Sequence, residues 1–224
     1  MPGLLAAAHE LKAPLVLMRQ LALEIEETAG QSEAGRRLRF TSERSLRLVT
    51  NLTKTARLDD SLFSLEPVNI QTLCGDVADE LRPLAKEFDQ QIILDMPRTS
   101  LVSVAHRDLL HALVIGLCDN AIAHNSSGSR ITLSARVNRG RIELAVRDEG
   151  PGIARVQLRE LRSRLGKTPQ PVGARPRSSG LGLWIASQFA LAMSSTIGSV
   201  AHRQGNGMSF YVSLPQSRQL SLFE

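Results

Sequence analysis

The sequence predicts an α plus α/β protein: a helical hairpin that forms a dimeric four-helix bundle, followed by a two-layer α/β sandwich. Three observations predict this fold class. Apolar residues recur at steps of three and four as far as residue 58. Helical and strand patterns alternate from residue 64 onward. Finally, a hydrophobic content of 42% over 224 residues is ordinary for a globular protein with a core.

The first part, residues 4–58, reads as two helices separated by a polar turn at residues 29–33. The first helix carries a heptad seam, and the second carries a weaker apolar stripe. A single hairpin cannot bury both, so pairing of two hairpins into a four-helix bundle is expected. The seam comprises Leu4, Ala8, Leu11, Leu15, Met18, Ala22 and Ile25, and the stripe comprises Leu38, Ser45, Val49, Leu52 and Ala56.

The stretch HELKAPL, residues 9–15, places His9 and Glu10 side by side ahead of a proline. His9 lies outside the seam and is therefore expected to face solvent. Pro14 removes the amide that would bond to the Glu10 carbonyl, so a helix through this stretch should bend after the pair. A helix that begins only near Ala13, with His9 in a frayed end, is the alternative.

The second part interleaves strands with helices. Strands are predicted at residues 65–70, 91–96, 129–137, 141–149, 197–202 and 209–215, and helices at residues 71–90, 107–125 and 181–193. The turn at Asn138–Gly140 predicts a hairpin. Residues 154–179 are basic, contain glycine and proline, and are expected to form a loop.

Composition excludes several functions. Cys74 and Cys118 lack metal-ligand spacing and are expected to be buried, reduced thiols, which suits the cytoplasm. The longest apolar run is too short to cross a bilayer. The net charge of +5 is concentrated between Arg155 and Arg177, and aromatic residues make up only 4% of the chain, so no nucleic acid is expected as a partner.

Three short motifs of the second part carry chemistry. DEGPGI, residues 148–153, ends a strand with an acid and places two glycines where a ligand could approach the backbone. SSGLGL, residues 178–183, puts glycines at a helix start, where free amides favour phosphate. CDNAIAHN, residues 118–125, offers Asn120 as an oxygen ligand for magnesium. Taken singly, each also suits an ordinary turn or a helix cap.

Along the chain the motifs follow the order HELKAPL, CDNAIAHN, DEGPGI, SSGLGL and GNGMSFYVSLP. In this order they resemble the catalytic core of sensor histidine kinases of two-component systems. The resemblance covers nearly the whole chain. It implies a dimerisation and histidine phosphotransfer domain at residues 1–62, a linker at residues 63–66, and a Bergerat-type ATP-binding domain at residues 67–217. Residues 154–179 correspond to its ATP lid, and residues 218–224 form a tail.

The resemblance also implies roles for single residues. His9 would be the nucleophile that ATP phosphorylates, and Glu10 its base. Asp148 would accept a hydrogen bond from adenine, and Asn120 would bind Mg2+. The implied nucleotide-binding set is Asn120, His124, Asp148, Gly150, Gly152, Arg175, Arg177, Gly180, Leu181, Gly182 and Leu183. The implied partners are a second copy and the receiver domain of a response regulator.

The chain departs from the family pattern at Gly116, Ala123 and His124, and its lid lacks a phenylalanine motif. These departures keep open a degenerate nucleotide-binding scaffold that acts through dimerisation and partner contacts. An ATPase or serine kinase that shares the fold would leave HELKAPL unexplained. A cytoplasmic location is expected, including as the cytosolic part of a membrane-bound sensor.

The tail contains a second resemblance. QLSLF, residues 219–223, looks like the short peptide by which bacterial proteins bind the replication sliding clamp, with Gln219 and Phe223 at its ends. A tail that packs on its own domain or extends into solvent is the alternative.

Overall fold

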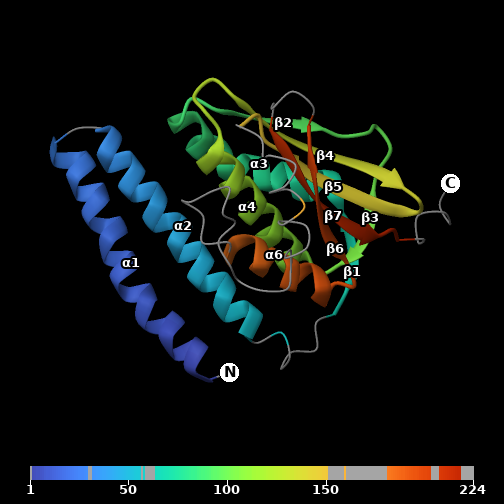
Figure 1. The fold of residues 1–224 in the computed structure, drawn as a ribbon, viewed down its shortest axis with the longest axis horizontal. Coiled ribbons are helices and arrows are strands. Elements are labelled where there is room, and N and C mark those ends of the chain that lie inside the picture. The colour runs from blue at the N-terminus through green and yellow to red at the C-terminus, as the bar shows by residue number, and fades with distance from the viewer. Residues whose placement is uncertain are drawn as a thin grey trace. The chain divides into compact units, whose positions relative to one another are not determined.

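A computed structural model describes residues 2–29, 32–56, 58, 64–150, 159, 181–202 and 207–217 (Figure 1). The chain divides into two compact units, Met1–Leu62 and Phe63–Glu224, and each is described by itself. None of the helices in the described ranges combines the length and the apolar character needed to span a membrane.

The first unit consists of helices α1 (Pro2–Ala29) and α2 (Glu33–Ala56), which pack against each other along a hairpin. Both helices lie where the sequence predicts them. Pro14 lies inside α1, and the helix continues on both sides of it. The alternative in which the helix begins near Ala13 is therefore wrong, and His9 belongs to a formed helix.

The heptad seam of α1 divides into two stripes. Ala8 and Ala22 are buried, with the half-buried Leu15 between them. The alternate seam positions Leu11, Met18 and Ile25 are 52%, 48% and 43% exposed. Within this chain, one half of the seam is covered and the other half is not.

The predicted stripe of α2 is covered only in part within this chain. Leu38 is exposed, and the buried residues of the helix are Gly35, Phe40 and Ser42. Burial of the phenylalanine removes more apolar surface from water than burial of the leucine would, so the helix presents Phe40 instead. The remaining stripe residues, Ser45, Val49, Leu52 and Ala56, are half-buried.

The second unit is built on a five-stranded mixed sheet in the order β2-β4-β5-β7-β6. Its strands are β2 (Gln91–Asp95), β4 (Arg130–Asn138), β5 (Arg141–Arg147), β6 (Thr196–Ala201) and β7 (Met208–Pro215). Only the pairing of β2 with β4 is parallel. In the β4–β5 hairpin, Arg139 and Gly140 have φ of 52° and 74°, as the predicted tight turn requires.

Helices α3 (Ile70–Glu87), α4 (Arg107–His124) and α6 (Leu181–Ala192) cover one face of this sheet (Figure 1). Alternate residues of the central strands point into the core between the two layers. Those of β4 and β5 are Ile131, Leu133, Ala135, Ile142, Leu144 and Val146, all buried. The predicted α/β character is confirmed, and the helical face of the sheet holds the core.

A small second sheet pairs β1 (Glu66–Asn69) with β3 (Val102–Ala105). Sequence analysis predicted β1 but missed β3. The strand is only four residues long and is held by distant partners. The Ser103 hydroxyl donates to the carbonyl of Pro215 at 2.8 Å, and the Ser217 amide donates to the carbonyl of Val102 at 2.8 Å.

Cys74 and Cys118 are free and fully buried, as predicted. Burial raises the pKa of the Cys74 thiol to about 12 and that of Cys118 well above its ordinary value. Because the thiolate is the reactive form, we expect neither cysteine of the native protein to react with an aromatic disulfide reagent at pH 8. Absorbance of the released thiol should show both reacting after denaturation in urea, and prompt labelling of the native chain would contradict the prediction.

Candidate functional site

Asp148 lies directly after β5 and is the centre of the candidate site. It is only 2% exposed. Its backbone amide donates to the carbonyl of Met208 at 2.8 Å, which continues the β5–β7 pairing by one residue. Its Oδ1 atom accepts hydrogen bonds from the amides of Met208 at 3.0 Å and Gly150 at 3.2 Å. A buried carboxylate is thus held in a fixed orientation at a strand end.

Two glycines allow the backbone to close around Asp148. A Cβ atom on Gly150 would lie 2.8 Å from the carbonyl oxygen of His124, so the turn after β5 touches the end of α4. Gly207 has φ of +89°, and its Cβ would overlap the backbone carbonyl of Asp148. Sequence analysis assigned Gly150 to close approach by a ligand, whereas in the structure its missing side chain lets the turn pack against α4. It gave Gly207 no part in the site.

Helix α4 carries two further residues of the predicted nucleotide site. His124 is its last residue, and Asn120 lies one turn earlier, on the same side of the helix. Asn120 is 8% exposed. Its side-chain oxygen is a hard ligand of the type that Mg2+ accepts, and Mg2+ commonly combines one or two protein ligands with phosphate oxygens. No group of three or more His, Cys, Asp or Glu side chains in the described ranges could hold a metal.

The remaining predicted residues of the nucleotide site are only partly described. Leu181, Gly182 and Leu183 form the first turn of α6, and this helix packs against α4. The first turn of a helix is a common binding place for phosphate, because backbone amides there point toward the helix start. Gly152, Arg175, Arg177, Gly180 and almost all of the predicted lid lie outside the described residues.

In the first unit, His9 and Glu10 are both exposed on α1. The expectation that His9 faces solvent is confirmed. Its neighbour Ala8 is buried, as expected for adjacent helical positions that point in different directions. An imidazole in this position is accessible to a reactant from outside the hairpin.

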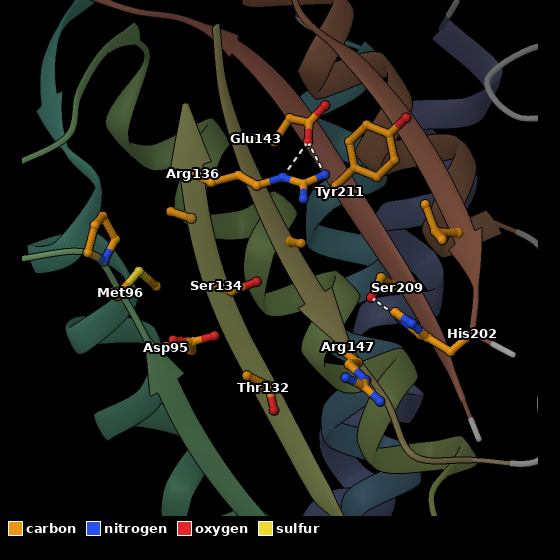
Figure 2. A pocket seen from close by; sticks show the side chains of 14 residues that line it. Asp95, Met96, Thr132, Ser134, Arg136, Glu143, Arg147, His202, Ser209 and Tyr211 are labelled. Carbon is orange, nitrogen blue, oxygen red and sulfur yellow. Dashed lines mark hydrogen bonds and ion pairs between the residues drawn. The ribbon is translucent and has the colours of Figure 1, made fainter. Parts of the chain in front are cut away.

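The open face of the sheet carries a hollow of about 570 Å3 that contains none of the predicted site residues. Figure 2 shows outward-facing side chains of β4, β5 and β7 around it, among them small ones such as Thr132 and Ser134. The positive and negative charges of the residues that line the hollow cancel: Arg136 is paired with Glu143, and Asp95 and Arg147 carry opposite charges. Burial, reinforced by the Arg147 cation, lowers the pKa of the lining residue His202.

Comparison with known proteins agrees with this geometry. Residues 105–218 match the family described as histidine kinase-, DNA gyrase B-, and HSP90-like ATPase. The sensor protein kinase PmrB of Pseudomonas aeruginosa is 29% identical over 218 residues, 95% of this chain and 45% of the relative. The sensor protein CutS of Streptomyces coelicolor is 27% identical over 215 residues, 93% of this chain and 51% of the relative. The chain spans about half the length of these relatives.

Solved structures show the same fold. Full-length ShkA, crystallised in complex with AMPPNP, superposes with a TM-score of 0.66 at 26% identity and covers 96% of this chain and 46% of its own. The Acinetobacter baumannii histidine kinase AdeS gives a TM-score of 0.61 at 21% identity, with 94% of this chain and 98% of its own covered. The comparisons give no support to a sliding-clamp contact, and the tail Gln219–Phe223 lies outside the described residues. The family match spans more than half of the chain and includes the buried aspartate, so this protein belongs to the histidine kinase-, DNA gyrase B- and HSP90-like ATPases.

Proposed function

We propose that this chain is the catalytic core of a sensor histidine kinase of a two-component system. In this proposal the part at residues 67–217 binds ATP with Mg2+, and the γ-phosphoryl group passes to His9 in the part at residues 1–62. The sensor kinases among the relatives, which match 93–95% of the chain, support the assignment. The observation that carries it is the buried Asp148 carboxylate, oriented by two backbone amides next to the glycine-lined turn.

The site residues suit an adenine nucleotide. A carboxylate held in a buried place can accept a hydrogen bond from an exocyclic amino group, and the contact gains strength from the low local dielectric. Gly150 lets the turn after Asp148 lie directly against the end of α4, since a side chain there would meet the His124 carbonyl. Asn120 would bind Mg2+, and the first-turn amides of α6 would bind phosphate. Arg175 and Arg177 of the lid would balance the charge of the γ-phosphate.

Phosphorylation of His9 follows from its position on α1. A neutral imidazole is a good nucleophile near neutral pH, and the adjacent Glu10 carboxylate would accept the proton from the other ring nitrogen as the nitrogen–phosphorus bond forms. The bond from phosphorus to the β,γ-bridging oxygen breaks, and ADP leaves. The phosphoryl group would then pass to an aspartate of a response-regulator receiver.

The uncovered half of the α1 seam supports a homodimer. Leu11, Met18 and Ile25 lie at heptad spacing and are exposed. Burial of such side chains against the same surface of a second copy would stabilise a four-helix bundle. We also propose that the chain acts in the cytoplasm, including as the cytosolic part of a longer membrane-bound sensor.

Replacement of Asp148 by asparagine should weaken binding of ADP, measured by calorimetry with Mg2+, by about 10- to 100-fold. The asparagine oxygen can still accept from the Gly150 and Met208 amides. However, an NH2 group then replaces the second carboxylate oxygen, and it cannot accept a hydrogen bond from adenine. Asp95→Asn is the matched control, because Asp95 also ends a strand but is exposed. Equal ADP affinity of parent and Asp148→Asn would exclude this adenine contact.

The alternative, a degenerate scaffold, is not favoured by the comparisons, although Gly116 and Ala123 on α4 depart from the family pattern. A scaffold of this kind would dimerise and contact its partners without transferring phosphate. Incubation of the chain with ATP labelled in the γ-phosphate distinguishes the two functions, since only a kinase acquires label on histidine.

A further inference from the structure

We propose that Asn125, Arg130 and Glu149 form a polar clamp that positions the Asp148–Gly150 turn against the end of α4 and so sets the affinity of the site for adenine nucleotide. The inference rests on the proposed function, since it assigns a positioning role within that nucleotide site. Sequence analysis gave none of these three residues a role.

The three residues of the polar clamp close a ring of hydrogen bonds. Asn125 caps α4; its Oδ1 atom accepts from the Glu149 amide at 3.0 Å, and its Nδ2 atom donates to the Arg130 carbonyl at 3.2 Å. The Arg130 amide donates to Glu149 Oε2 at 2.9 Å. The Arg130 guanidinium donates to Glu149 Oε1 from Nε at 3.1 Å and from Nη2 at 2.9 Å. Each member is thus bonded to both others.

This ring joins three segments: the end of α4, the start of β4 and the turn after β5. Glu149 stands between Asp148 and Gly150, so fixing both its amide and its carboxylate restrains its two neighbours. The position expected for a Cβ on Gly150 lies 3.4 Å from Asn125 Oδ1 and 3.3 Å from Asp148 Oδ1. The clamp therefore touches the same closely packed turn that orients the buried carboxylate.

The clamp is anchored on its helical side as well. Gln90, which is buried before β2, donates from Nε2 to the carbonyls of Ile122 at 3.1 Å and Asn125 at 3.4 Å. The last turn of α4 is consequently held from two directions, and Asn120 and His124 belong to the same helix. Loss of the clamp would let the Asp148 turn shift relative to these residues. Small displacements of this kind cost affinity, because the contacts to a ligand depend on geometry.

The same hairpin contains a matched ion pair outside the site. Arg136 donates from Nε and Nη2 to Glu143 Oε2 at 3.0 Å and 2.8 Å. Hydrogen bonds from Arg130 lower the pKa of the Glu149 carboxylate. Burial opposes ionisation of Glu143, but hydrogen bonds from Asn138 and Arg136 outweigh it and lower the pKa of that carboxylate too. Both carboxylates are therefore ionised at neutral pH. The Arg136 pair lies on the open face of the sheet, around the hollow (Figure 2). Glu143→Gln therefore controls for loss of an arginine–glutamate pair as such.

The test is calorimetric titration of ADP with Mg2+ into the parent chain and the variants Asn125→Ala, Glu149→Gln and Glu143→Gln. We expect Asn125→Ala to weaken binding about tenfold and Glu149→Gln about threefold, whereas Glu143→Gln stays within about twofold of the parent. Asn125→Asp, which keeps the acceptor for the Glu149 amide, should retain more affinity than Asn125→Ala. Parent-like affinity of Asn125→Ala and Glu149→Gln, or an equal loss in Glu143→Gln, would overturn the clamp.

A second measurement needs no nucleotide and separates failure of the clamp from failure of the proposed function. The amides of Gly150 and Met208 both donate to Asp148 Oδ1. If the clamp positions the turn, their hydrogen exchange should accelerate at least about tenfold in Asn125→Ala and stay unchanged in Glu143→Gln. If these two amides exchange equally slowly in Asn125→Ala and in the parent, the inference is refuted, whether or not the parent binds ADP. Failure of the parent to bind ADP would by itself refute only the proposed function.

Discussion

Replacement of His9 by alanine is expected to abolish acid-labile phosphorylation of the chain by ATP, a loss of at least about 10³-fold. Alanine has no atom that could attack phosphorus, so no slower version of the same step remains. The substitution lies at an exposed helical position and should leave the fold intact, since alanine favours a helix. The measurement is incorporation of γ-labelled phosphate, followed by its release in acid.

Matched variants make this result specific. His111→Ala removes another partly exposed helical histidine, located on α4, and should leave the label unchanged. Glu10→Gln should slow labelling by about 10²-fold or more, as expected for loss of a general base, without abolishing it. ADP affinity should be unchanged in His9→Ala, because the proposed nucleotide contacts lie in the other unit. Retention of acid-labile label in His9→Ala would move the acceptor to another residue.

Gly207→Ala should lower the free energy of unfolding of the second unit by more than about 4 kcal/mol. Two effects combine. A φ of +89° is unfavourable for alanine, and the new methyl group would overlap the Asp148 carbonyl. Met208, which follows Gly207, is hydrogen-bonded to Asp148 through both its carbonyl and its amide, and β7 pairs with β5 from Ser209 onward, so relief requires separation of the strands. Nucleotide binding should be lost with the position of Asp148.

Gly140→Ala separates these two effects. Gly140 has a similar φ of +74°, but no described atom lies within 4 Å of the expected Cβ. Its cost should therefore be only that of the backbone conformation, about 1–2 kcal/mol. Urea unfolding followed by the fluorescence of Trp184, the single tryptophan and a residue of α6, measures both variants in the second unit. Equal losses in Gly207→Ala and Gly140→Ala would show that the overlap has no energetic effect.

Much of the fold could be predicted from local pattern. Alternating apolar residues on both sides of Asn138–Gly140 define the β4–β5 hairpin, because a strand with one buried face needs that period. The steps of α1 likewise identify a helix with a seam. The motifs around Asp148 and Asn120 indicated a nucleotide site before any geometry was known. In each case the signal lies within about twenty residues.

Other features required the tertiary structure. Ala8 and Leu11 are both apolar positions of the heptad pattern, so the sequence predicts burial of each. In the folded chain, packing against α2 leaves Ala8 buried and Leu11 exposed. Strand β3 is too short to show a period and exists through its pairing with β1 and its bonds to residues 215 and 217. The close contact of Gly207 with Asp148 follows only from the pairing of β5 with β7. This pairing brings Met208, the neighbour of Gly207, to Asp148, 60 positions earlier in the chain.

The sequence by itself determined which chemical groups this protein carries and which faces of its helices and strands are apolar. Only the tertiary structure decided that Asp148, Gly150, Gly207 and the polar clamp meet at one end of α4. The physical reason is that side-chain periodicity is a property of neighbouring residues. A hydrogen-bond ring between distant residues instead depends on the distances between segments that only the packed sheet brings together.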